Sequence, residues 1–137
     1  MTGEKDLGKL LSTMRPELQP GAFVFATFAG HDVPSGLEPI GTFREAEGLT
    51  LILPAHDAGH PDITASKPLR QITLTVHSSL EAVGLTAAFA AELTRHGISA
   101  NVVAGYYHDH VFVDAGDAER AVAVLEALSE RHGQDPA

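Results

Sequence analysis

Histidine, aspartate and tyrosine side chains follow one another in the segment Tyr106–His110, which reads Tyr-Tyr-His-Asp-His and runs into an apolar stretch. In an extended backbone His108 and His110 point to the same face, where two imidazoles can bind one metal ion. A zinc site needs a third protein ligand, and His77 on a neighbouring predicted strand is the candidate that the sequence offers. A histidine of this group, beside Asp109, could instead act as a general base. The segment therefore raises two chemical hypotheses, a metal site and a histidine-dependent enzyme.

The same segment also fits a tight turn between two strands. If Tyr107–Asp109 forms the turn, the side chains of the two histidines scatter and no metal site forms. The spacing also shows no recognisable set of nucleophile, base and orienting residue. The sequence therefore favours a polar hairpin or a subunit contact here, and we expect no enzymatic activity and no cofactor.

Composition restricts the class of protein further. The 137 residues carry a net charge of −9, and the nine Lys and Arg residues form no basic run, which argues against nucleic-acid binding. The absence of cysteine excludes disulfides, zinc ribbons and thiol catalysis, and fits a reducing compartment. No window approaches the roughly 18 apolar residues of a membrane span, and the N-terminus does not resemble a signal peptide. We therefore expect a soluble, cytoplasmic protein that binds neither nucleic acid nor membranes.

The second half of the chain predicts strands and helices in a regular order. Residues Gln71–His77 alternate apolar and polar side chains, as in a strand with one buried face. Ser78 and Glu81 have the spacing of a capping box, so a helix is expected to begin near Ser79 and to end at Gly97. Two further strands and a last helix follow, over Ile98–Tyr106, over His110–Val113 and from Asp117 onward. This is the order of a ferredoxin-like plait that lacks its final strand.

The first half is less regular, but it contains strands that the second half lacks. A helix is expected over Leu7–Met14 with Asp6 as its N-cap, because apolar residues recur there at helical spacing. A strand over Ala22–Ala29 and a hairpin over Thr42–Leu53 follow, and the polar stretch His56–Pro68 is the expected seam between the halves. One strand of this half is expected to complete the sheet of the second half. The sequence thus predicts an α+β fold.

Three long segments resemble a family of small bacterial ACT-domain proteins of unassigned function, which is related to the regulatory domain of aspartate kinase. They are Phe43–Thr50, Ile72–Ala88 and Asn101–His110. The resemblance covers nearly the whole chain. It implies two ACT-type βαββα(β) plaits in tandem, with antiparallel sheets and helices on one face, divided into residues 1–67 and residues 68–137.

The resemblance also implies a function, because ACT domains are regulatory modules that bind small molecules, most often amino acids, between paired domains. By this resemblance the chain is expected to be a non-catalytic, amino-acid-binding module and a homodimer. The family's ligand site lies in the loop before the first helix and at the head of the second strand. The matching positions here are His77, Ser78, Ser79, Leu80, Val83, Gly84, Ser99, Asn101 and Val102. Two departures are the replacement of the usual Asp-Pro-Gly-like turn by His77-Ser78-Ser79, and the lack of a kinase domain.

The chemistry of an amino acid fits such a site. Free amides in the first turn of a helix suit its carboxylate, and the side-chain carbonyl of Asn101 suits its ammonium group. Gly84 would let a ligand approach the predicted helix closely. Each residue also has a structural interpretation: Ser78 and Ser79 as caps, Asn101 as a partner of loop backbone, and Gly84 as a helix–sheet contact. A ligand-free interaction subunit therefore remains a further hypothesis.

Overall fold

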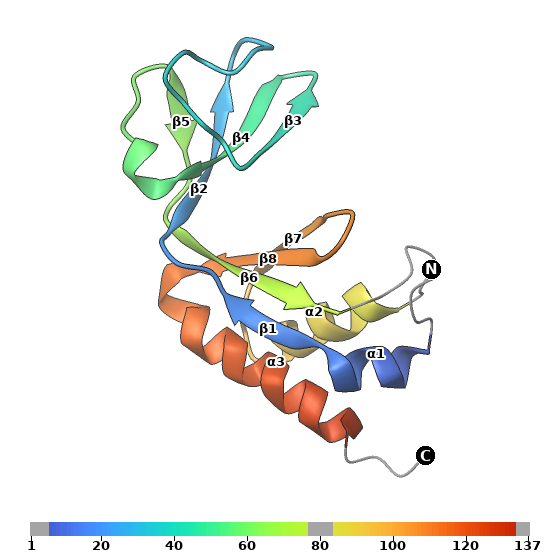
Figure 1. Cartoon of the computed structure of the whole chain (residues 1–137). Coiled ribbons are helices and arrows are strands. Elements are labelled where there is room, and N and C mark those ends of the chain that lie inside the picture. The colour runs from blue at the N-terminus through green and yellow to red at the C-terminus, as the bar shows by residue number, and fades with distance from the viewer. Residues whose placement is uncertain (1–5, 77–83, 134–137) are drawn as a thin grey trace. The chain divides into compact units, whose positions relative to one another are not determined.

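The computed structural model describes residues 6–76 and 84–133 and divides the chain into two compact units (Figure 1). One, which we call the terminal unit, combines residues up to Gln19 with residues from Gln71 onward. The other, which we call the inserted unit, is Pro20–Arg70. Residues up to Gln19 thus belong to the same compact unit as the C-terminal half. The division into residues 1–67 and residues 68–137 stays a prediction. No helix within the described ranges is long and apolar enough to cross a membrane.

The inserted unit is an antiparallel sheet with a small apolar core. Its strands are β2 (Phe23–Phe28), β3 (Gly41–Glu45), β4 (Gly48–Pro54) and β5 (Ile63–Ala65), with a short 3-10 turn η1 (Ala55–Asp57) after β4. Strand β4 pairs with β2 and β3, and β5 pairs with β2. The predicted hairpin is confirmed, and Gly48 begins its second strand. A Cβ at Gly48 would lie 2.5 Å from the carbonyl oxygen of Phe28, so no larger residue fits there.

The terminal unit contains a four-stranded sheet in the order β1-β6-β8-β7. These strands are β1 (Arg15–Leu18), β6 (Leu69–Thr75), which enters the unit at Gln71, β7 (Ala100–Ala104) and β8 (Asp109–Asp114). The first half of the chain does supply the missing strand, as predicted, but that strand is β1. From the sequence no strand was expected at these residues, but Pro16 pairs with Leu74 in this short strand.

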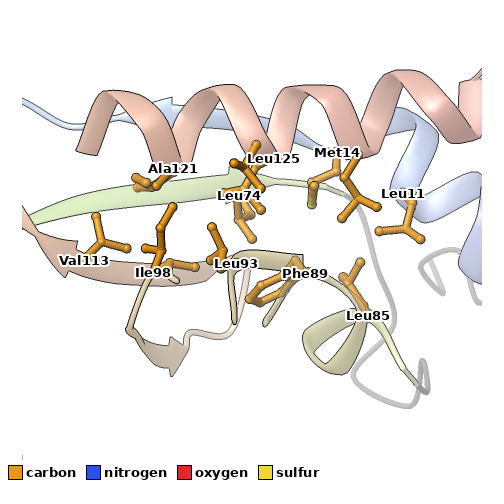
Figure 2. Packing of buried hydrophobic residues seen from close by; sticks show 14 of the residues in the cluster. Leu11, Met14, Leu74, Leu85, Phe89, Leu93, Ile98, Val113, Ala121 and Leu125 are labelled. Atoms are coloured by element: carbon orange, nitrogen blue, oxygen red, sulfur yellow. The ribbon is translucent and has the colours of Figure 1, made fainter. Parts of the chain in front are cut away.

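Three of the described helices belong to the terminal unit, and they share one core with its sheet. They are α1 (Leu7–Thr13), α2 (Leu85–Arg95) and α3 (Ala118–Gly133), the last preceded by a 3-10 turn η2 (Ala115–Asp117). Figure 2 shows side chains from the three helices meeting Leu74 of β6 and Val113 of β8. Phe89 and Leu93 of α2 and Leu125 of α3 are fully buried there, so each long helix turns an apolar face toward the sheet. The α+β, ferredoxin-like fold is therefore confirmed.

The start of α2 differs from the prediction. The capping box of Ser78 and Glu81 lies outside the described residues, and the described helix begins at Leu85. Gly84 is therefore the N-cap and not an interior residue of the helix. Its φ of 95° is in the left-handed region, and it makes no side-chain cap, so a backbone requirement accounts for the glycine.

Candidate functional site

Five of the nine predicted ligand residues lie outside the described part of the chain. They are His77, Ser78, Ser79, Leu80 and Val83. The other four belong to the terminal unit: Gly84 at the start of α2, and Ser99, Asn101 and Val102 at the head of β7. Their role in binding a ligand stays a prediction.

Within one terminal unit, Gly84 and Asn101 lie toward opposite ends of the sheet. Asp109, the first residue of β8, shares a hydrogen bond with Thr86 in the first turn of α2, so this end of the sheet adjoins the start of the helix. Asn101 pairs with Phe112, which follows Asp109 by three residues on the same strand. Three residues of a strand span roughly 10 Å at about 3.3 Å per residue, and the two parts of the predicted site are separated by this distance along the sheet.

Neighbouring residues of β7 also point to different faces. Val102 packs against the helix-side core, while Asn101 lies on the opposite face. The side-chain nitrogen of Asn101 donates to the carbonyl oxygen of Phe112 at 3.4 Å. Its Oδ1 has no hydrogen-bond partner within the described ranges, and it remains able to accept from a ligand.

The His-Asp-His segment forms the hairpin that the sequence favoured, but the turn lies over residues 105–108, and Asp109, expected in the turn, is the first residue of β8. Ala104 pairs with Asp109, and the amide of Gly105 donates to the carbonyl oxygen of His108 at 2.9 Å, which closes the turn. Tyr106 and Tyr107 occupy the tip, 80% and 79% exposed, with their rings edge to face at a centroid distance of 5.0 Å. The turn thus presents two aromatic side chains to solvent.

The metal hypothesis finds no support in the described part of the chain, where no group of three His, Cys, Asp or Glu side chains could hold an ion. His77, its proposed third ligand, lies outside that part. His108 has a buried Nδ1 with no hydrogen-bond partner among the described residues. Nδ1 of His110 is already engaged in hydrogen bonds within the sheet.

His110 belongs to a polar network on the sheet face away from the helices. Its Nδ1 lies 3.1 Å from Nε2 of Gln71 and 3.0 Å from Oγ1 of Thr73. Nε2 of Gln19 donates to the same Thr73 oxygen at 3.1 Å. Because an amide nitrogen can only donate, His110 Nδ1 accepts and the proton of the neutral ring is on Nε2. Sequence reasoning identified the polar face but not this network.

Two groups of this end of the sheet have shifted pKa values. Burial raises the pKa of the Asp109 carboxyl, although the charge of His110, the hydrogen bond with Thr86 and the charge of His108 act in the other direction. Burial lowers the pKa of His110, the charge of His108 lowers it further, and Asp109 opposes both. The Thr86–Asp109 contact joins α2 to β8 and was not predicted, since its residues are far apart in the sequence.

Two family models match the chain, and both are described as an ACT domain. One matches residues 2–70 and the other residues 66–127. Together they extend over both the inserted and the terminal unit. No curated protein matches the sequence.

Several solved structures are similar. A Vibrio cholerae protein of unknown function, described as a possible transport protein, is 52% identical, with a TM-score of 0.80 over 91% of this chain and 97% of that chain. An Agrobacterium tumefaciens protein is 17% identical, with a TM-score of 0.70 over 85% and 89%. The regulatory subunit of aspartate kinase from Thermus flavus is 10% identical, with a TM-score of 0.61 over 83% and 96%. The last two likenesses show a shared fold.

Proposed function

This chain belongs to the ACT domain family, and we propose that it is a non-catalytic regulatory module that binds an amino acid. The observation that carries the proposal is the match of ACT models to both halves of the chain. The similarity of fold to the regulatory subunit of an aspartate kinase supports a regulatory role. The loop before α2 and the head of β7 are the proposed ligand-binding elements.

The separation of these two elements within one copy favours a site shared by two copies. Strand β7 is the last strand in the described order of the terminal unit, so one of its edges is open to a further strand. If two β7 strands paired antiparallel, the head of one would lie beside the tail of the other. Because the tail of β7 adjoins the start of α2, this pairing would place Asn101 of one copy near the helix start of its partner.

The chemistry of the proposed site matches a zwitterion. The first amides of α2 have no side-chain cap at Gly84, and they can donate to a carboxylate. Oδ1 of Asn101 can accept from an ammonium group at the edge of the sheet, and Val102 can contact the apolar part of the ligand from the helix side. Each contact follows from the position of the residue on β7 or α2.

A thermal-shift screen of the full-length protein with the common amino acids tests this function. A ligand present at 100 times its dissociation constant should stabilise the folded protein by about 2.7 kcal/mol and raise its melting temperature. Mass spectrometry of the recovered amino acid should show no chemical change. If no amino acid shifts the melting temperature, or if the amino acid is converted, the proposed function is wrong.

Asn101→Ala tests the proposed site. We expect the variant to fold normally, because the residue is exposed, and to bind the amino acid at least tenfold more weakly, because the ammonium acceptor is removed. Thr64→Ala is the control, since Thr64 is an exposed strand residue of β5 in the inserted unit and belongs to no part of the proposed site. Equal affinities of the two variants, measured by isothermal titration calorimetry, would exclude the role of Asn101.

A ligand-free interaction subunit is the second candidate function. The exposed pair of Tyr106 and Tyr107 favours it, because aromatic side chains are enriched in protein interfaces. This candidate predicts no response to amino acids, together with the loss of a partner complex in Tyr106→Ala.

A further inference from the structure

A hollow of about 400 Å³ in the terminal unit lies away from α2 and β7. The end of α1, the start of β1 and the last turns of α3 form its walls. Its lining includes Ser12, Met14, Arg15, Glu126, Ser129 and Glu130. Its size is in the range of small-molecule sites, and it shares no residue with the predicted ligand site.

Arg15 is fixed in the wall of this hollow through one of its guanidinium nitrogens. Nη1 donates to the carbonyl oxygens of Ser12 and Met14 at 3.1 and 3.0 Å, and to Oγ of Ser129 at 3.3 Å. The Ser129 hydroxyl in turn donates to the Ser12 carbonyl at 3.2 Å. The guanidinium has five N–H donors, and no contact of Nε or Nη2 is found among the described residues. The positive charge is therefore held in position with donors still available.

Glu126 and Glu130 of α3 supply two negative charges to the lining of the same hollow. They are one turn apart on α3, so their side chains are neighbours and repel each other. Both lie toward the C-terminal half of α3, where the helix dipole adds negative potential. Within the described ranges neither carboxylate has a hydrogen bond or an ion pair, and Arg15 is not within ion-pair distance of either. The lining of the hollow thus contains one positive and two negative side chains that do not pair with one another.

We propose that this hollow is a ligand site for a small molecule with one carboxylate and two cationic groups, the charge pattern of a basic amino acid. The carboxylate lies on the free donors of Arg15, and the two cationic groups lie on Glu126 and Glu130. The Cβ atoms of such helical neighbours are about 5–6 Å apart, so a single small ligand spans both carboxylates. Pro16, a half-buried residue that also lines the hollow, provides an apolar contact for the carbon chain of the ligand.

The charge count distinguishes this ligand from related ones. One cation and two anions in the wall are balanced by a ligand of net charge +1. A neutral side chain in place of the second cation leaves one glutamate unpaired, and a diamine without a carboxylate leaves Arg15 unpaired. Selectivity for the basic amino acid over both analogues is therefore a direct consequence of the three charged residues.

Calorimetric titration of the full-length protein with L-lysine, L-norleucine and cadaverine tests the proposal. We expect L-lysine to bind at least tenfold more tightly than either analogue, with an affinity that falls as salt is added. Absence of L-lysine binding, or equal binding of norleucine, would overturn the proposal.

The variants Glu126→Gln and Glu130→Gln locate the binding. Each should weaken L-lysine binding at least tenfold, while the melting temperature without ligand stays equal or rises, because the repulsion between the carboxylates is removed. Glu119→Gln, an exposed glutamate in the first turn of the same helix, is the matched control for charge. Wild-type affinity in both pocket variants would overturn the assignment.

The test also separates this site from the proposed site at β7. Loss of L-lysine binding in Glu126→Gln, with normal binding in Asn101→Ala, supports the hollow. The reverse result assigns L-lysine to the β7 site and contradicts the inference. If the wild type binds two L-lysine molecules per chain and each variant binds only one, the result supports both sites.

Discussion

Glu92 shows how one residue couples the two long helices of the terminal unit. The side chain is 6% exposed, and its carboxylate contacts Arg95 of the same helix at 2.8 Å and Arg131 of α3 at 3.0 Å. His96 lies 3.8 Å away. Burial alone would raise the pKa of Glu92, but the hydrogen bond with Arg131 and the charges of Arg131, Arg95 and His96 outweigh it, and the pKa is lowered.

Glu92→Gln should reduce the free energy of unfolding at pH 7. The expected loss is about 1–2 kcal/mol, because the charged hydrogen bonds are weakened and the half-exposed arginines can still be hydrated. In the wild type, the pKa of Glu92 is lower in the folded protein than in the unfolded chain, where it is about 4.3. This difference stabilises the folded protein at pH values above the unfolded pKa, and the stabilisation is lost as the pH falls through the folded-state pKa.

Urea unfolding at pH 7 and between pH 5 and 3 measures this effect. The wild type should lose more stability on acidification than Glu92→Gln, while Glu119→Gln, which removes an exposed carboxylate, should follow the wild type. If wild type and Glu92→Gln lose equal stability on acidification, the ion pairs of Glu92 do not stabilise the fold.

His110 gives the stability of the protein a second pH dependence. Here folding favours the neutral form of a base, whereas at Glu92 it favours the charged form of an acid. Burial and His108 lower its pKa, so the folded state favours the neutral ring that accepts from Gln71 and Thr73. The unfolded chain takes up a proton near pH 6.5, and therefore stability should fall as the pH drops below 6.5. A nuclear magnetic resonance titration of the His110 ring should give a midpoint below 6.5. A midpoint above 6.5 would contradict the network.

At the scale of elements, local patterns predicted most of the fold. The alternation of Ile72 and Leu74 with polar residues predicted β6 and its buried face, and Asp6 does cap α1, accepting from the Lys9 amide at 3.0 Å. Strand β1 was missed because a four-residue strand with a proline has no distinctive pattern. It becomes evident only through its pairing with β6.

The polar network could not be predicted for a related reason. The contact between Thr73 and His110 joins residues 37 positions apart, and it depends on the register of β6 and β8. Alternation identifies the face of a strand but not its neighbour across the sheet. Similarly, the start of α2 differed from the capping-box position, because Gly84 begins the described helix through a backbone conformation and not through a side chain.

Gly84→Ala tests this backbone requirement at the start of α2. The left-handed φ of 95° is unfavourable for alanine, and its Cβ would lie 3.4 Å from Cδ2 of Leu7. We expect a loss of about 1–2 kcal/mol in the free energy of unfolding. Gly8→Ala, within α1, is the control, and it should stabilise by about 0.5–1 kcal/mol because alanine favours a helix. A melting temperature of Gly84→Ala equal to or above that of the wild type would contradict the backbone requirement at Gly84.

At the scale of the whole molecule, the open edges of the sheets decide how copies can associate. Strand β7 is an end strand of the described sheet of the terminal unit, and β3 is an end strand of the described sheet of the inserted unit. Each exposes an apolar side chain, Val103 at 37% and Phe43 at 72%. Unprotected edge strands pair readily with other chains, and a lysine on the edge prevents this. The proposed shared ligand site requires the β7 edge.

Val103→Lys should therefore dissociate the proposed dimer, and Phe43→Lys is the matched control on an edge strand of the inserted unit. Sedimentation equilibrium should show a wild-type dimer, a weakening of its association by at least tenfold in Val103→Lys, and no change in Phe43→Lys. An amino acid bound between two copies must also raise the dimer fraction, because a ligand stabilises the state to which it binds. A wild type that stays monomeric with and without the amino acid would contradict the shared site. If only Phe43→Lys dissociated the protein, the interface would lie at β3. If ligand binding were then independent of dimerisation, the whole site would lie within one copy.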